Sequence, residues 1–89
     1  MASYSVRIKK SAAKELERIA GKKDRQRIAE RISALGGEPR PAGVERLSGT
    51  AEKYRVRQGD YRIVFELDDS AATVTIVKIG HRNDMSPES

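Results

Sequence analysis

Three arginines, Arg55, Arg57 and Arg62, flank a Gly59-Asp60 pair that is typical of a two-residue β-hairpin loop. This spacing predicts a hairpin in which Arg57 lies opposite Arg62 and Arg55 shares their face. Directly opposed like charges destabilise a sheet by up to about 1 kcal/mol. Guanidinium groups donate paired hydrogen bonds to phosphates and stay charged at any working pH. The spacing therefore favours anion binding, since an anion between Arg57 and Arg62 would remove their repulsion.

The opposite face of the same hairpin carries a period-two apolar row suited to packing on helices. Its members are Tyr54, Val56, Ile63, Phe65 and Leu67. One face thus builds a core while the other displays cations. The alternative interpretation is that the arginines are ordinary solvated residues on the open side of an antiparallel sheet.

The first part of the chain predicts a strand and a helical hairpin. Apolar and polar residues alternate over residues 3–9, as in a strand with one buried face. Ser11 is the expected cap of a first helix that ends at Gly21. Asp24 is the expected cap of a second helix, which ends at the glycines of residues 36–37. The core positions of the second helix are Ile28, Ile32 and Leu35.

The remainder predicts a loop and three strands. Residues 36–50 are rich in Gly and Pro, with Val44 and Leu47 as anchors into the core. Strands follow at 52–58, 61–67 and 73–79. The expected fold is a small α+β domain of order β-α-α-β-β-β, with an antiparallel-rich sheet packed against the N-terminal helical hairpin. Residues 1–84 form this single domain and residues 85–89 a flexible tail.

The composition limits the class of protein. The 89 residues carry a net charge of +5, which favours a polyanionic partner, either nucleic acid or an acidic protein segment. The absence of cysteine excludes disulfides, and with a single histidine it predicts neither a metal site nor a cofactor. No segment is apolar enough to span a membrane, and the first residues lack the apolar core of a signal peptide. We therefore expect a cytoplasmic protein.

Basic side chains also line the two expected helices, mostly at positions outside the apolar spacing. Most are expected to be simply solvated. The alternative is a surface that tracks an RNA backbone without reading its sequence. The residues are Lys14, Arg18, Lys22, Lys23, Arg25, Arg27 and Arg31.

Four segments together resemble a known family over nearly the whole chain. They are Leu47-Ser48-Gly49, Tyr54-Arg55-Val56-Arg57, Gly59-Asp60-Tyr61-Arg62-Ile63-Val64-Phe65 and Ile79-Gly80-His81-Arg82-Asn83-Asp84. The chain resembles the RelE/ParE superfamily of bacterial and archaeal toxins from toxin-antitoxin modules. A Gly-Asp-Tyr-Arg hairpin combined with a terminal Gly-His-Arg-x-Asp is more specific than either motif alone.

The resemblance implies one of two activities, because the same scaffold supports both. RelE-type toxins cleave messenger RNA in the ribosomal A site, whereas ParE-type toxins poison DNA gyrase and tend to lack the basic catalytic residues. Arg55, Arg57 and Arg62 fall where RelE-type members carry catalytic and phosphate-binding side chains. His81 or Arg82 falls where a final basic residue sits. The resemblance therefore implies a ribosome-dependent endoribonuclease.

Such cleavage without a metal needs a base, an acid and fixed cations beside the phosphate. Arginine suits the role of fixed cation but is a poor base. Histidine is the side chain that titrates near neutral pH, so His81 is the candidate for proton transfer and Arg82 a candidate phosphate contact. A histidine beside a strand end is also commonly a surface residue without a catalytic role.

One departure from the family pattern keeps the second activity open. Family members commonly continue Gly-His-Arg-x-Asp-Val-Tyr, whereas this chain reads Asp84-Met85-Ser86. Ser86 cannot stack on a base as a tyrosine does. The alternative is therefore a gyrase-directed toxin or a non-enzymatic homologue. Either version implies a cognate antitoxin, with a heterotetramer as one form of the complex, and the first also implies the ribosome and its message as partners.

Overall fold

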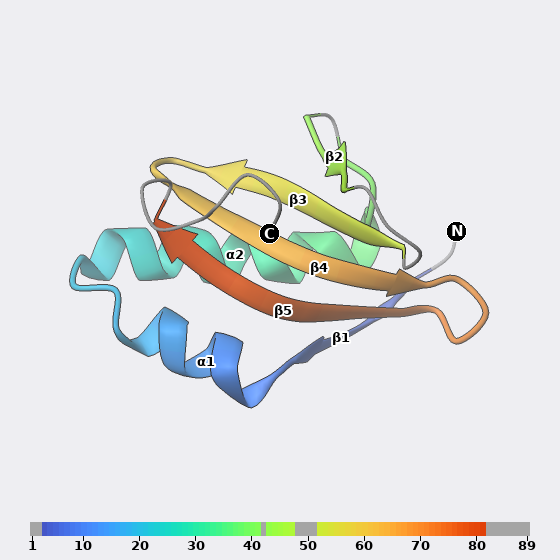
Figure 1. Cartoon of the computed structure of the whole chain (residues 1–89), viewed down its shortest axis with the longest axis horizontal. Coiled ribbons are helices and arrows are strands. Elements are labelled where there is room, and N and C mark those ends of the chain that lie inside the picture. Colours follow the sequence, from blue (N-terminus) through green and yellow to red (C-terminus); the bar gives the residue numbers. More distant parts are fainter. Residues whose placement is uncertain (1–2, 42, 48–51, 82–89) are drawn as a thin grey trace.

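The computed structural model describes residues 3–41, 43–47 and 52–81. They form an α+β domain, as the sequence predicts (Figure 1). The elements are β1 (Ser5–Ile8), α1 (Lys10–Glu17), α2 (Lys22–Gly37), β2 (Glu45–Arg46), β3 (Lys53–Gln58), β4 (Tyr61–Asp68) and β5 (Thr73–His81). The expected domain end at residue 84 and the expected tail over 85–89 lie outside the described residues. None of the described helices is long and apolar enough to cross a membrane.

All five strands join one sheet of order β1-β5-β4-β3-β2. The long strands β3, β4 and β5 pair antiparallel, and β1 adds to β5 in parallel. The helices carry the chain from β1 at one edge of the sheet to β2 at the other edge, and β5 then returns beside β1. Both helices pack on the same side of the sheet (Figure 1).

The core lies between this side of the sheet and the helical hairpin. The alternating row expected on the β3–β4 hairpin is buried there, and Tyr54 stacks on Phe65 with ring centroids 5.8 Å apart. From the helices, Ile28, Ile32 and Leu35 face the sheet as their spacing predicts. The opposite face of β3 and β4 carries the arginines.

The helix boundaries differ from those expected. Ser11 does not cap α1, because that helix begins at Lys10 with Lys9 at its N-cap position and no side-chain cap. The helix ends at Glu17, well before Gly21. Gly21 is instead the N-cap residue of α2. Asp24 therefore lies in the first turn of α2, where a carboxylate interacts favourably with the helix dipole.

The fold contains one strand more than predicted, so its order is β-α-α-β-β-β-β. Within the loop expected over 36–50, Glu45 pairs with Arg55 and Arg46 pairs with Tyr54 to form β2. Two exposed residues are too few to show a period-two pattern, which is why the sequence did not reveal this strand. Val44 packs on the core, as expected of an anchor.

Candidate functional site

The β3–β4 hairpin has the predicted register. Gly59 adopts a φ of 61°, which glycine tolerates, and the loop contains only Gly59 and Asp60. Arg57 pairs directly with Arg62, and Arg55 pairs with Val64. The three arginines therefore lie on the face of the sheet that points away from the helices.

A cavity of about 320 Å³ opens beside these arginines, at the edge of β3. β2 pairs with β3 only at Tyr54 and Arg55, so no strand in the described residues pairs with the edge beyond them. Helix α2 lies under that edge and contributes Arg31 to the cavity. The lining residues are Arg31, Gly43, Glu45, Arg55, Val56, Arg57 and Arg62. The structure thus brings the three predicted arginines together and adds a fourth.

Two guanidinium groups in this cavity hold donors without acceptors. The Nε atoms of Arg31 and Arg55 are buried and make no hydrogen bond with any residue that the structure describes. The side chain of Arg55 is only 14% exposed, and its Nη2 lies 3.2 Å from Glu45 Oε1. A buried donor left unpaired costs about 1–3 kcal/mol, more when it is charged. Both Nε atoms are inaccessible to solvent in the free protein, so an anion in the cavity would pair with them once the guanidinium groups turn toward it.

The charges of the cavity do not cancel. Four arginines line it against one carboxylate, that of Glu45. Guanidinium groups pair with phosphate oxygens in a fixed planar geometry, and several of them can stabilise the added negative charge of a phosphorane. The arrangement is therefore suited to binding a phosphate and to stabilising charge that develops on it.

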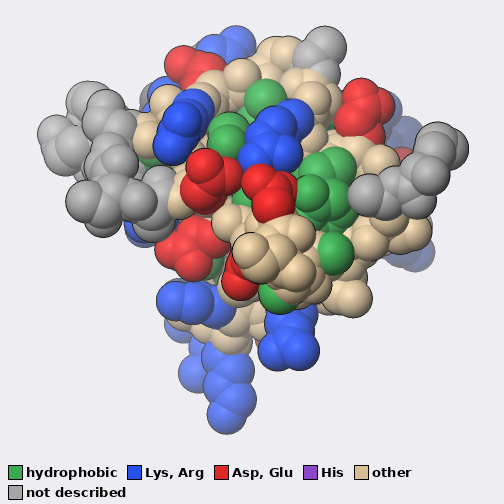
Figure 2. Space-filling view, turned by 90° about the vertical axis from the view of Figure 1, so that its right-hand side faces the viewer, with side chains coloured by type: hydrophobic (Ala, Val, Ile, Leu, Met, Phe, Trp, Pro, Cys, Tyr) green, Lys and Arg blue, Asp and Glu red, His purple; other side chains and the backbone are tan. Residues whose placement is uncertain are grey.

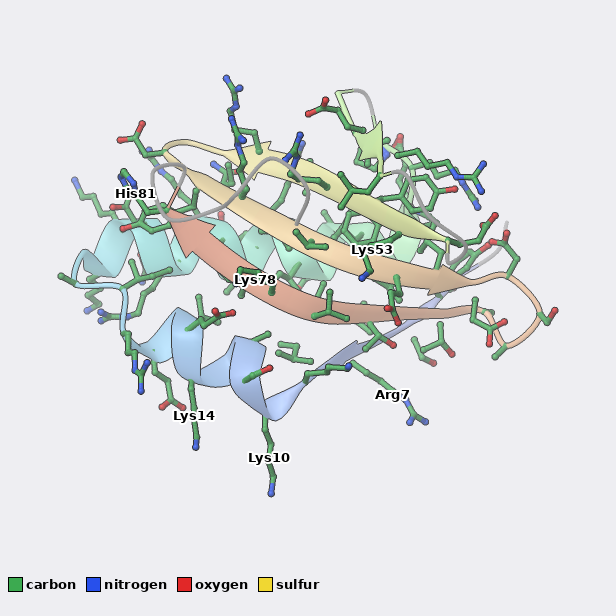
Figure 3. All side chains as sticks on the ribbon, viewed as in Figure 1. Arg7, Lys10, Lys14, Lys53, Lys78 and His81 are labelled. Atoms are coloured by element: carbon green, nitrogen blue, oxygen red, sulfur yellow. The ribbon has the colours of Figure 1, made fainter. Side chains whose placement is uncertain are left out.

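His81 lies on the other side of the sheet. It pairs with Tyr61 across β4 and β5, and the two rings meet edge to face with centroids 5.4 Å apart. Both line a second cavity of about 410 Å³ beside α1, together with Glu15 and Arg18. His81 stands at the end of β5 (Figure 3), next to Gly80, which pairs with Arg62. His81 and the arginines thus lie at the same end of the sheet but line different cavities. The catalytic role of His81 stays a prediction. Arg82 lies outside the described residues.

A cluster of carboxylates lies at the end of the molecule opposite the Gly59-Asp60 turn, and three of them form ion pairs with basic side chains. Figure 2 faces this end and shows carboxylates gathered at its centre. They surround the β4–β5 turn, and those lining the hollow there are Glu52, Glu66, Asp68 and Asp69. Most of these carboxylates thus have basic partners, whereas the arginine cavity at the other end of the hairpin has an excess of positive charge.

Arg40 contacts two carboxylates of this cluster and the hydroxyl of Tyr54. Its Nη2 lies 3.0 Å from Asp69 Oδ2 and 3.2 Å from Glu52 Oε2, and its Nε donates to the Tyr54 hydroxyl. The Tyr4 hydroxyl donates to Asp69 Oδ1 at 2.6 Å. Hydrogen bonds from Arg40 and Tyr4 lower the pKa of Asp69, and the bond to Asp69 raises the pKa of Tyr4. This network fixes the segment that leads from α2 toward β2.

Sequence reasoning did not single out Arg31 and Glu45 as site residues. Arg31 was grouped with the other basic residues of the helices, although it follows Ile28 by three positions and precedes Leu35 by four. That spacing places Arg31 at the border of the apolar face and is a usable signal. Glu45 had no such signal, because its position depends on the short strand β2.

Comparisons with known proteins match the chain to a family of toxins. A family model described as the ParE toxin of the type II toxin-antitoxin system parDE matches residues 6–85. Toxin RelG of Mycobacterium tuberculosis (strain ATCC 25618 / H37Rv) is 27% identical over 82 residues, which cover 92% of this chain and 94% of that protein.

Solved structures show the same fold. The RelE–RelB complex of Pyrococcus horikoshii OT3 contains a chain with 31% identity and a TM-score of 0.82, matched over 93% of this chain and 99% of that one. The RelBE2 toxin-antitoxin complex of M. tuberculosis gives 28% identity and a TM-score of 0.79, over 94% and 97% of the two chains. The isolated E. coli RelE toxin, at 21% identity and a TM-score of 0.76 over 89% and 84%, shares the fold.

Proposed function

The chain belongs to the RelE/ParE family of toxins from type II toxin-antitoxin systems, and we propose that it is an endoribonuclease that cleaves messenger RNA in the ribosomal A site. The observation that carries this proposal is the direct pairing of Arg57 with Arg62 beside a cavity that Arg55 also lines. The fold itself gains nothing from two opposed like charges, whereas a scissile phosphate bound between them would relieve their repulsion.

In the proposed reaction the arginines act on the phosphate. Attack of the ribose 2′-oxygen on phosphorus adds negative charge to the non-bridging oxygens, and Arg55, Arg57 and Arg62 would neutralise it. Preorganised charged donors of this kind act mainly on the transition state, because they need no reorganisation as the charge develops. The products would be a 2′,3′-cyclic phosphate and a free 5′-hydroxyl.

Proton transfer is assigned to the end of β5. His81 would exchange the proton of the 2′-oxygen or of the leaving 5′-oxygen, and Arg82 would contact the phosphate. The His81–Tyr61 pair is next to the Gly80–Arg62 pair, but His81 lies on the helix side of the sheet. The substrate would therefore have to lie across the end of the sheet, over the Gly59-Asp60 turn, for His81 and the arginines to act on one phosphodiester.

Inhibition of DNA gyrase is the second candidate function. The family model that matches the chain carries the description of a ParE toxin. In addition, Ser86 stands where RelE-type members commonly have a tyrosine. A non-enzymatic homologue is the remaining version of this alternative. The retained arginines favour the nuclease, because gyrase-directed members tend to lack them.

We also propose a cognate antitoxin as partner, acting in the cytoplasm, where the ribosome is. The similar toxin chains of P. horikoshii and M. tuberculosis were crystallised as toxin-antitoxin complexes. An acidic, extended segment together with an amphipathic helix would cover the basic face in the inactive complex. A heterotetramer of two toxins and two antitoxins is one arrangement of that complex.

The nature of the products tests the proposal. Purified chain is incubated with ribosomes carrying a defined message, with the same message free of ribosomes, and with supercoiled DNA plus gyrase. The nuclease produces 2′,3′-cyclic ends only on the ribosome-bound message. Intact messages together with gyrase-dependent DNA breaks would transfer the assignment to the second candidate.

A further inference from the structure

We propose that Arg31 and Arg55 form a subsite for a second phosphate of the RNA backbone, next to the phosphate held between Arg57 and Arg62. The identity of the ligand rests on the proposed function. The existence of the subsite rests on the cavity at the edge of β3, on two buried guanidinium donors without acceptors and on the position of Glu45.

The two arginines approach the cavity from different layers of the fold. Arg55 comes from the sheet and Arg31 from α2 beneath it, and both line the same cavity. In each of them the Nε is buried and makes no hydrogen bond within the described part of the chain. Buried polar groups are nearly always paired in folded proteins, so two unpaired donors beside one cavity favour a ligand that accepts hydrogen bonds there. Both donors are cationic, and the acceptor they fit is an anion.

Glu45 occupies part of this subsite in the free protein. Its Oε1 lies 3.2 Å from Arg55 Nη2, and the pairing of β2 with β3 sets Glu45 opposite Arg55. The carboxylate reaches Arg55 Nη2 but leaves Arg55 Nε and Arg31 Nε unpaired. Glu45 is largely exposed, with 68% of its side chain accessible, and is free to swing out. It is thus an internal competitor that an incoming phosphate displaces.

The dimensions of the cavity favour a nucleic-acid backbone over a protein helix. A volume of about 320 Å³ holds a phosphate and part of its sugar. An α-helix with side chains is about 10–12 Å across, so only single side chains of a docked helix would enter such a space. The cavity also continues to Arg57 and Arg62, so a strand that places one phosphate there carries the next one along the same row of arginines.

The subsite is tested by titrating the protein with a single-stranded RNA trinucleotide whose 2′-oxygens are methylated, which prevents cleavage. Binding is followed by NMR of the arginine Nε–H groups and by affinity. Arg31→Gln is compared with Arg27→Gln, which removes the same charge one turn earlier on the same face of α2, at an exposed side chain that does not line the cavity. We expect the Nε–H signals of Arg31 and Arg55 to shift on binding. Arg31→Gln should weaken affinity about tenfold, and Arg27→Gln by about twofold or less.

Glu45→Gln provides an independent arm that leaves all four arginines in place. Loss of the competing carboxylate should tighten trinucleotide binding about threefold, in line with the modest strength of an exposed ion pair. Unchanged or weaker binding would contradict the competitor role. Backbone spectra and thermal unfolding of each variant show whether the fold is retained.

The outcomes separate this inference from the proposed function. Equal losses for Arg31→Gln and Arg27→Gln, or no binding by the parent protein, would overturn the subsite even if the protein cleaves ribosome-bound messages. If Arg31→Gln alone weakens trinucleotide binding and the protein leaves messages intact, the subsite would be supported and the nuclease activity would be ruled out. An acidic peptide that shifts the Arg31 signal where the trinucleotide does not would overturn the assignment to RNA.

Discussion

Arg57 on β3 and Arg62 on β4 lie directly opposite each other, one residue pair away from the Gln58–Tyr61 pair that closes the hairpin. Both line the cavity that Arg31 and Arg55 also line, whereas the carboxylates around the β4–β5 turn lie at the far end of the hairpin. The carboxylates at the β4–β5 turn are largely paired with basic side chains, whereas the cavity holds more arginines than carboxylates. A polyanion approaching this protein would be attracted to the end that carries the opposed arginines.

Salt dependence should report how many phosphates the arginines contact. Each phosphate contact on a single strand contributes a slope of about −0.7 to the plot of log affinity against log salt concentration. Replacing Arg57 by Gln should therefore weaken binding of the methylated trinucleotide and reduce the slope by about 0.7. Replacing Arg7, an exposed arginine that lines the hollow at the β4–β5 turn, should leave the slope unchanged. Equal effects of the two changes would show that only net charge matters.

The glycine of the hairpin turn should be needed for stability as well as for geometry. Gly59 has a φ of 61°, and a Cβ placed on it would meet no atom within 4 Å, so backbone strain is the cost that any side chain adds. Gly59→Ala should lower the free energy of unfolding by about 1 kcal/mol, and Gly59→Asn by less, because asparagine tolerates this conformation. Chemical denaturation measures both. Equal stability of all three proteins would contradict the turn.

His81 should affect the pH profile if it transfers a proton. His81→Gln should slow cleavage of the ribosome-bound message by about 10²–10⁴-fold and remove one limb of the dependence of rate on pH. Tyr61→Phe keeps the ring that contacts His81 and should retain the rate and both limbs. A His81→Gln rate equal to that of the parent at every pH would confine His81 to packing against Tyr61.

The Arg40 network should make stability depend on acid. The pKa of Asp69 is lower in the folded protein than the ordinary value of 3.8, chiefly because Arg40 donates hydrogen bonds to its carboxylate. The ionised carboxylate therefore stabilises the fold at pH values above 3.8, and this contribution is lost as the pH falls through the lower folded pKa.

Asp69→Asn should accordingly lower Tm at pH 7, and the difference from the parent should close as the pH falls below the folded pKa of Asp69. Thermal unfolding over a pH series measures this. Asp60→Asn, at an exposed carboxylate in the β3–β4 turn, is the control and should leave Tm nearly unchanged at pH 7. A difference for Asp69→Asn that stays constant from neutral pH into strong acid would contradict the role of its charge.

The sequence predicted the hairpin and its register because each signal was local. Gly59 and Asp60 specify the turn, and the alternating residues on either side specify which face is buried. The fourth arginine needed tertiary information, since Arg31 reaches the cavity only because α2 packs beneath the edge of β3. The position of Glu45 depends on a two-residue strand that has no pattern of its own. His81 faces the helices because it pairs with Tyr61, and this pairing depends on the register between β4 and β5.

The account depends most directly on Arg62. The decisive measurement is primer-extension mapping of message ends after brief induction of this chain without an antitoxin, beside Arg62→Ala and the control Arg7→Ala. We predict discrete cuts spaced in codon frame for the parent and for Arg7→Ala, and none for an Arg62→Ala protein whose thermal unfolding shows that it is folded. Growth arrest with intact messages, or unchanged cuts in Arg62→Ala, would contradict the proposed nuclease.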